Sequence, residues 1–233
     1  GTPVPLYPEV AQIGAEFAKA GPALSGTSVH SQVAILHSYD SRWAINWQRH
    51  NKNFDPVAQI VSYYKPLREV AQSIDIVQPS APLDGYKLVV APGLEVISEA
   101  EAKHLIAYVR NGGHLVLGQR TGMKNEDNGL WPQREPGPLA AILGGRVDQF
   151  YAIDSEAKPG DTVPVTGVWG TTTSKIWAEQ LSTTAPDTQV LMRYGKSNGW
   201  LDCKPAAITR KGGKGSITYI GAWMDDATML KAA

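Results

Sequence analysis

Residues 86–118 read YKLVVAPGLEVISEAEAKHLIAYVRNGGHLVLG, and this stretch decides the fold class. Two short apolar runs, 86–91 and 114–118, are typical of buried strands. Between them Ser98 and Glu101 form a capping-box pattern, and apolar positions then recur at helical spacing up to an Asn-Gly-Gly sequence that ends the helix. A strand, a helix and a strand in this order predict a parallel sheet that is covered on both faces.

The same alternation extends toward the N-terminus. Pro56 after Asp55 predicts the start of a helix over about 56–71. We expect an α/β fold with a doubly wound, mainly parallel sheet and helices on both faces, whose strands lie near 32–37, 74–77, 86–91 and 113–118. A leading helix is predicted over 8–20, ended by Gly21-Pro22, and residues 38–55 show no clear period and are expected to form a long loop.

The C-terminal part, after about residue 145, has a different texture. Turn residues separate short strand-like runs, and one helix is predicted over 175–181. These extra strands are expected either to extend the first sheet or to build a β-layer on it; they lie at 163–168, 189–194, 206–209 and 216–220, with a hairpin connection at 211–215.

Composition excludes several classes of protein. Lys plus Arg and Asp plus Glu both number 22, so the formal net charge is zero, and neither a nucleic-acid partner nor a membrane-surface partner is expected. One cysteine excludes an internal disulfide framework and a Cys-rich zinc site. No apolar run reaches the roughly 18 residues of a membrane span. The chain begins without Met or a leader pattern and is expected to be processed or excised, and a cytoplasmic rather than a secreted location is expected.

Standard catalytic motifs are missing from the sequence. It contains no G-x-S-x-G elbow, no phosphate-binding loop and no H-E-x-x-H, so no catalytic residue, metal or cofactor is predicted. His37 at a strand end and Cys203 are interpreted as structural residues. Asn125-Glu126 lacks the second strand-end carboxylate that a retaining sugar hydrolase requires.

Two loops carry the candidate functional residues. Loop 38–55 holds Tyr39, Trp43, Trp47 and Phe54, and loop 119–135 holds Arg120, Lys124, Glu126 and Trp131. Both loops follow strands and should emerge at the same edge of a parallel sheet. Aromatic residues and Arg are enriched at interface hot spots, so we expect a protein interface rather than a pocket. The interface or ligand-facing candidates are Trp43, Trp47, Arg120, Lys124 and Glu126; the charges of the second loop could instead simply pair with one another.

A series of sequence pieces, taken in order, resembles a known family. They are Glu9-x-x-x-Ile13-x-x-Glu16, Ser31-Gln-Val-Ala-Ile-Leu36 followed by Trp43, Tyr63-Tyr64-x-x-Leu67, Ile74-Asp-Ile-Val77, Gly85-Tyr-Lys-Leu-Val-Val-Ala-Pro92, Tyr108-Val-x-Asn-Gly-Gly-His-Leu-Val-Leu117, Arg120-Thr-Gly-x-Lys124, Pro136-Gly-Pro-Leu139, Leu143-Gly144, Ile176-Trp-Ala-Glu179 and Gly212-x-x-Gly-x-x-x-Tyr-Ile-Gly221. Together they resemble the middle, trimerisation domain of family 42 glycoside hydrolases, the bacterial β-galactosidases.

The resemblance implies a flavodoxin-like or class I glutamine amidotransferase-like fold without a nucleophile. It also implies that both catalytic glutamates lie in a preceding (β/α)₈ barrel, that galactoside substrate is met only through that barrel, and that the full-length enzyme is a homotrimer. Residues 1–24 are then a leading helix from the end of the barrel or a linker, and residues 25–233 are the trimerisation-type α/β domain. The expected function is that of a non-catalytic assembly domain.

Two other functions stay open at this point. One is a stand-alone amidotransferase-like hydrolase that uses Cys203 or His37. The other is a carbohydrate-binding module in which Trp43 and Trp47, spaced i and i+4, stack on sugar rings.

Overall fold

The structure is a computed structural model that describes residues 3–153, 162–197 and 199–233. The chain divides into two compact units, Gly1–His30 and Ser31–Ala233.

The first unit contains helix α1 (Tyr7–Leu24). The helix does not stop at Gly21 as predicted but continues through Pro22, which lies in the last turn and removes only one i→i−4 hydrogen bond there. No side chain of α1 is buried, and the apolar stripe that predicted the helix, formed by Val10, Ile13 and Phe17, is exposed.

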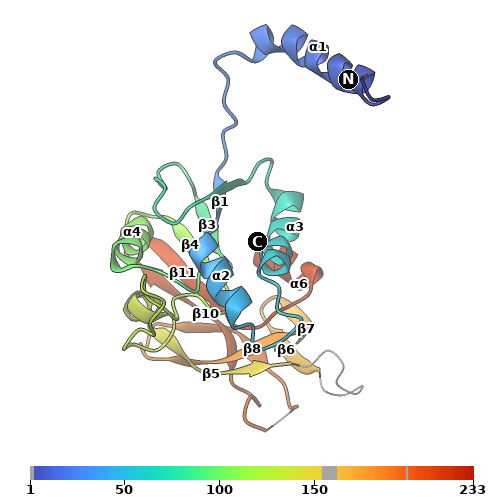
Figure 1. Ribbon diagram of the computed structural model, residues 1–233. Helices are drawn as coiled ribbons and strands as arrows, with labels where there is room; N and C mark the ends of the chain where they lie inside the picture. The colour runs from blue at the N-terminus through green and yellow to red at the C-terminus, as the bar shows by residue number, and fades with distance from the viewer. Residues whose placement is uncertain (1–2, 154–161, 198) are drawn as a thin grey trace. The chain divides into compact units, whose positions relative to one another are not determined.

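In its described residues, the second unit is built on a nine-stranded sheet of order β2-β1-β3-β4-β11-β10-β9-β6-β7 (Figure 1). The first four are mutually parallel, which confirms the prediction; β11 adds parallel to β4, and the strands from β11 onward pair antiparallel. The strands are β1 (Val33–Leu36), β2 (Asp75–Val77), β3 (Leu88–Ala91), β4 (His114–Leu117), β6 (Val163–Gly167), β7 (Gly170–Ser174), β9 (Gln189–Tyr194), β10 (Pro205–Gly212) and β11 (Gly215–Ile220).

Helices cover both faces of the parallel strands, as predicted (Figure 1). Successive strand residues point to opposite faces, so Ala34 and Leu36 pack in one apolar cluster and Ile35 in the other. The first cluster lies under α4 and α5, and the second lies under α3 and α6. These helices are α3 (Pro56–Val70), α4 (Glu99–Arg110), α5 (Ala140–Leu143), which follows the short 3₁₀ turn η1 (Gly137–Leu139), and α6 (Asp226–Ala232).

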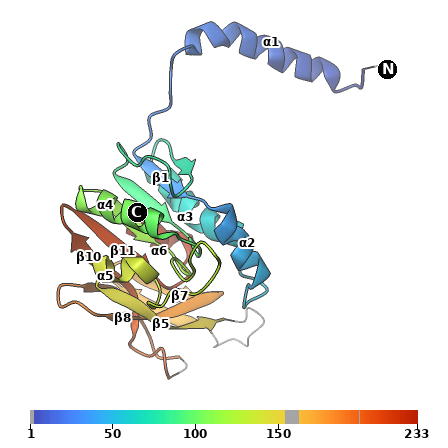
Figure 2. The same cartoon turned by 60° about the vertical axis from the view of Figure 1, so that its left-hand side comes forward.

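A separate two-stranded ribbon, β5 (Gly145–Ala152) with β8 (Trp177–Thr183), packs on the sheet next to α5 (Figure 2). The predicted helix over 175–181 is therefore wrong. Trp177 and Leu181 are buried, and so is Ala178 on the opposite side of the strand, because the ribbon is covered on both faces. The C-terminal part thus both extends the sheet and adds a β-layer.

Residues 38–55, predicted as a loop, contain helix α2 (Tyr39–Trp47). The Ser38 side chain caps it by accepting a hydrogen bond from the Ser41 N–H. Its inner face is short and only partly apolar, with Ser41, Ala44 and Ile45 buried. The period was hidden because the largest apolar side chains of the segment lie on the opposite, outer face.

Among the helices in the described part of the chain, none combines the length and the apolar character needed to cross a membrane.

Candidate functional site

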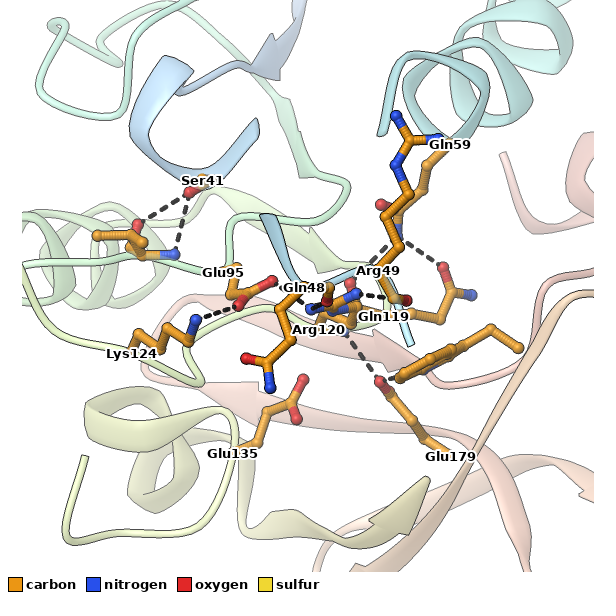
Figure 3. A network of polar contacts seen from close by, with 12 residues as sticks. Ser41, Gln48, Arg49, Gln59, Glu95, Gln119, Arg120, Lys124, Glu135 and Glu179 are labelled. Atoms are coloured by element: carbon orange, nitrogen blue, oxygen red, sulfur yellow. Dashed lines mark hydrogen bonds and ion pairs between the residues drawn. The ribbon is translucent and has the colours of Figure 1, made fainter. Parts of the chain in front are cut away.

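A buried ion network lies where the chain leaves two neighbouring parallel strands. Glu95 follows β3 and Arg120 follows β4, so both residues emerge at the carboxyl edge of the sheet. The Arg120 Nη2 atom lies 2.9 Å from Glu95 Oε2, and the Lys124 Nζ atom lies 3.1 Å from Glu95 Oε1 (Figure 3). The side chains of Glu95 and Arg120 are 0% exposed. A charge buried this deeply is tolerated only when it is paired, and here one carboxylate serves two cations.

Arg120 ties this network to helix α2. Its guanidinium donates hydrogen bonds to the carbonyl oxygens of Gln48 (2.9 Å) and Arg49 (3.1 Å), which directly follow the helix. The rings of Phe54 and Trp177 lie 5.1 and 5.2 Å from the guanidinium carbon, within cation–π range. The carbonyl groups at a helix C-terminus carry partial negative charge, so Arg120 holds this end of α2 electrostatically as well as by geometry.

The other end of α2 is fastened to the loop that carries Glu95. The Ser41 hydroxyl donates to the Val96 carbonyl oxygen (3.1 Å) and accepts from the Val96 N–H (3.0 Å). Val96 in turn forms a β-bridge with Lys124. Helix α2 is therefore held at both ends by one buried assembly.

The outer face of α2 carries an aromatic stripe. Tyr39, Trp43 and Trp47 follow one another at i, i+4 and i+8 and are 59%, 64% and 91% exposed. The rings of Tyr39 and Trp43 are 5.8 Å apart. Leu130, which is also exposed, forms an antiparallel β-bridge with Lys124. A rigid, exposed aromatic surface with polar neighbours is typical of a protein interaction site.

The loop after β3 keeps its shape because of Gly93. This residue has φ +65°, and a Cβ atom there would lie 2.3 Å from Gln59 Oε1. The Gln59 amide donates to the carbonyl oxygen and the side-chain oxygen of Gln119, the residue before Arg120. Glycine at 93 thus allows α3 to approach the loops that carry the ion network.

A second group of buried carboxyls adjoins Arg120 and was not predicted from the sequence. Glu179 Oε1 accepts the Arg120 backbone N–H at 2.9 Å. The Tyr219 hydroxyl oxygen lies 2.7 Å from Glu135 Oε1 and 2.9 Å from Glu179 Oε2. Burial raises the pKa of Glu179 to about 7, and burial together with the Glu179 charge raises the pKa of Glu135.

Comparisons with known proteins identify the family. The model of the β-galactosidase trimerisation domain (Glyco_hydro_42M) matches residues 31–232. The chain belongs to the β-galactosidase trimerisation domain family.

Similar whole enzymes are much longer than this chain. It is 35% identical over 233 residues to β-galactosidase Bga of Halorubrum lacusprofundi, covering 96% of this chain and 32% of Bga. Against β-galactosidase BgaB of a Geobacillus species it is 30% identical over 223 residues, covering 94% of this chain and 32% of BgaB. The chain therefore spans about a third of the length of these curated relatives.

Solved structures show the same fold. The β-galactosidase of Halorubrum lacusprofundi matches with a TM-score of 0.82 and 35% identity, covering 94% of this chain and 32% of that one. The enzyme from Bacillus circulans matches with a TM-score of 0.86 and 21% identity, covering 98% of this chain and 34% of that one.

The structure separates the predicted surface residues of this trimerisation domain into two groups. Trp43 and Trp47 are exposed on α2, and Glu126 is exposed on its loop. Arg120 and Lys124, expected at the surface, are buried beneath α2, and so is Phe54. The two segments, 38–55 and 119–135, do lie close together as predicted. The first supplies the exposed aromatic residues, and the second supplies the buried cations that support them.

Cys203 and His37, the two residues that a stand-alone hydrolase would use, lie far from each other in the sheet. His37 follows β1 and contacts the Tyr39 ring, whereas Cys203 lies in the turn between β9 and β10. Strands β3, β4 and β11 separate β1 from β10 in the sheet, so the two residues are on the order of 19 Å apart at a strand spacing of about 4.8 Å. They do not form a nucleophile–base pair.

Proposed function

We propose that this trimerisation domain is a non-catalytic assembly domain that associates with further copies of itself through the exposed aromatic stripe of α2. The observation that carries the proposal is the 91% exposure of Trp47 on a helix fixed at both ends. Rigid aromatic side chains lose little conformational entropy on association, which suits them to hot spots.

The expected assembly is a homotrimer, and the name of the family supports self-association. In a cyclic trimer each interface is heterologous, so α2 of one copy meets a different surface of the next copy. Zero net charge supports such contact because long-range repulsion between copies is weak. In this proposal Arg120 and Lys124 act as positioning residues that hold α2, and Glu126 lies on the rim.

The remaining parts of the chain fit the same account. Residues 1–24 are proposed to be the end of a preceding catalytic barrel or a linker to it, and residues 25–233 to be the trimerisation-type domain. In this proposal the barrel covers the apolar stripe of α1, which is exposed in this chain. The parent protein is proposed to be a β-galactosidase that meets its galactoside through that barrel. Within the α/β class, the fold type is proposed to be flavodoxin-like or class I glutamine amidotransferase-like. Arg120, with φ +65° in the turn after β4, then occupies the place of their nucleophile.

Hydrogen exchange measured over a concentration series tests the proposal. Assembly should slow exchange at the backbone amides of residues 39–47 as the concentration rises, while α4 on another part of the surface stays unchanged. Exchange in 39–47 that is independent of concentration, in samples whose mass shows assembly, would place the interface elsewhere.

A further inference from the structure

We propose that Glu135, Tyr219 and Glu179 together hold one carboxyl proton at neutral pH, and that this proton resides on Glu135. The phenol oxygen of Tyr219 lies within hydrogen-bond distance of both carboxyl groups, at 2.7 and 2.9 Å. A phenol has one proton and can donate it to only one of them. The other short contact therefore requires a proton on a carboxyl group, which donates to the phenol oxygen.

The hydrogen bonds to Glu179 assign that proton to Glu135. Glu179 Oε1 accepts from the Arg120 backbone N–H at 2.9 Å and from the Trp177 indole N–H at 2.8 Å. Both N–H groups can only donate. When the Tyr219 hydroxyl donates to Oε2, Glu179 is satisfied as a carboxylate by three donors. Glu135 then carries the proton and donates it to the Tyr219 oxygen.

Charge balance in the buried network gives the same assignment. The groups that face Glu135 from the surrounding elements are Glu179 on β8, Tyr219 on β11, Glu95 after β3 and Arg120 after β4, with Lys124 paired to Glu95. Among these described residues three carboxyl groups meet two cations. A proton on Glu135 leaves two carboxylates and two cations, so the buried network is neutral.

The stored proton makes stability depend on pH. The Glu135 pKa is raised in the folded chain above its ordinary 4.5, chiefly by burial and by the Glu179 charge. Above about pH 5 the unfolded chain releases this proton and the folded chain keeps it, so stability falls as pH rises. Each retained proton increases the unfolding equilibrium constant up to about tenfold per pH unit. The raised pKa of Glu179 acts in the same direction up to about pH 7.

The substitution Glu135→Gln removes the ionisable carboxyl group and leaves the rest of the buried network in place. An amide has nearly the same shape as a carboxyl group, its N–H can donate to Tyr219, and it does not ionise. Glu69→Gln is the matched control, because Glu69 on α3 is exposed and belongs neither to the network nor to the aromatic stripe of α2.

Urea unfolding of the chain between pH 5 and pH 9 tests the proposal. The ratio of the wild-type unfolding constant to that of Glu135→Gln should rise at least about tenfold from pH 6 to pH 8, and Glu69→Gln should follow the wild type. Infrared spectra of the wild type at pH 8, above the pKa of about 7 of Glu179, should contain the carbonyl stretch of a protonated carboxyl group that Glu135→Gln lacks. Parallel pH profiles of wild type and Glu135→Gln, or no such band in the wild type, would overturn the proposal.

Discussion

The guanidinium of Arg120 donates a 2.9 Å hydrogen bond to the backbone carbonyl of Gln48, and this contact joins the buried ion network to helix α2. The two residues are far apart in the sequence, and the network beneath them is closed to solvent. An exposed aromatic surface is useful for assembly only if it is held in one position, because ordering a mobile segment on binding costs affinity. The network provides that support.

Removing the Arg120 guanidinium should destabilise the domain strongly. Arg120→Met leaves Glu95 buried with only Lys124 as its partner, and breaking a buried ion pair in this way costs about 3–5 kcal/mol. Arg146→Met is the matched control, because the Arg146–Asp148 pair is at the surface and should cost less than about 1 kcal/mol. Urea unfolding measures both. Equal losses in the two variants would show that the buried network does not support the fold.

A methyl group at position 93 should disturb the loop that carries Glu95. Gly93→Ala places a Cβ atom against Gln59 at a residue with positive φ, whereas Gly85→Ala has positive φ and open space. Both substitutions share the backbone strain, so the difference between them reports overpacking, about 1–3 kcal/mol. Thermal unfolding of the two variants measures it. Indistinguishable midpoints would mean that Gln59 moves aside without cost.

The chain alone should neither hydrolyse an aryl β-galactoside nor bind galactose. Retaining hydrolysis needs two carboxyl groups about 5–5.5 Å apart at a substrate-accessible site, whereas the Glu135 and Glu179 side chains are buried. Assays with a chromogenic galactoside and isothermal titration with galactose and lactose check this. Turnover that disappears in Glu126→Gln, or binding heat that disappears in Trp43→Ala, would contradict it.

Sequence patterns predict the parallel strands and their covering helices because the apolar period and the capping residues of each element lie within its own short stretch of sequence. Ser98 with Glu101 and Asp55 with Pro56 mark helix starts that the structure confirms. The sequence does not reveal helix α2 because the tryptophans of this helix face solvent. It wrongly predicts a helix at β8 because this strand is covered on both faces.

The buried ion network was harder to predict because its partners are distant in the sequence. Charged residues are almost never fully buried unless paired, so a charge-rich loop is expected to be solvated. One signal could have revealed the pair, since Glu95 and Arg120 each follow one of two strands predicted to be neighbours. Nothing in local pattern points to Glu135, which reaches the network through the tertiary fold alone.

Light scattering across a concentration series, comparing wild type with Trp43→Ala/Trp47→Ala, tests whether the aromatic stripe of α2 carries the assembly. Both side chains are exposed, so the double substitution should change the free energy of unfolding of each copy by no more than about 1 kcal/mol. The wild-type mass should rise with concentration toward three chains, and the mass of the variant should stay near one chain. A variant that assembles as readily as the wild type would show that the aromatic stripe of α2 is not the interface.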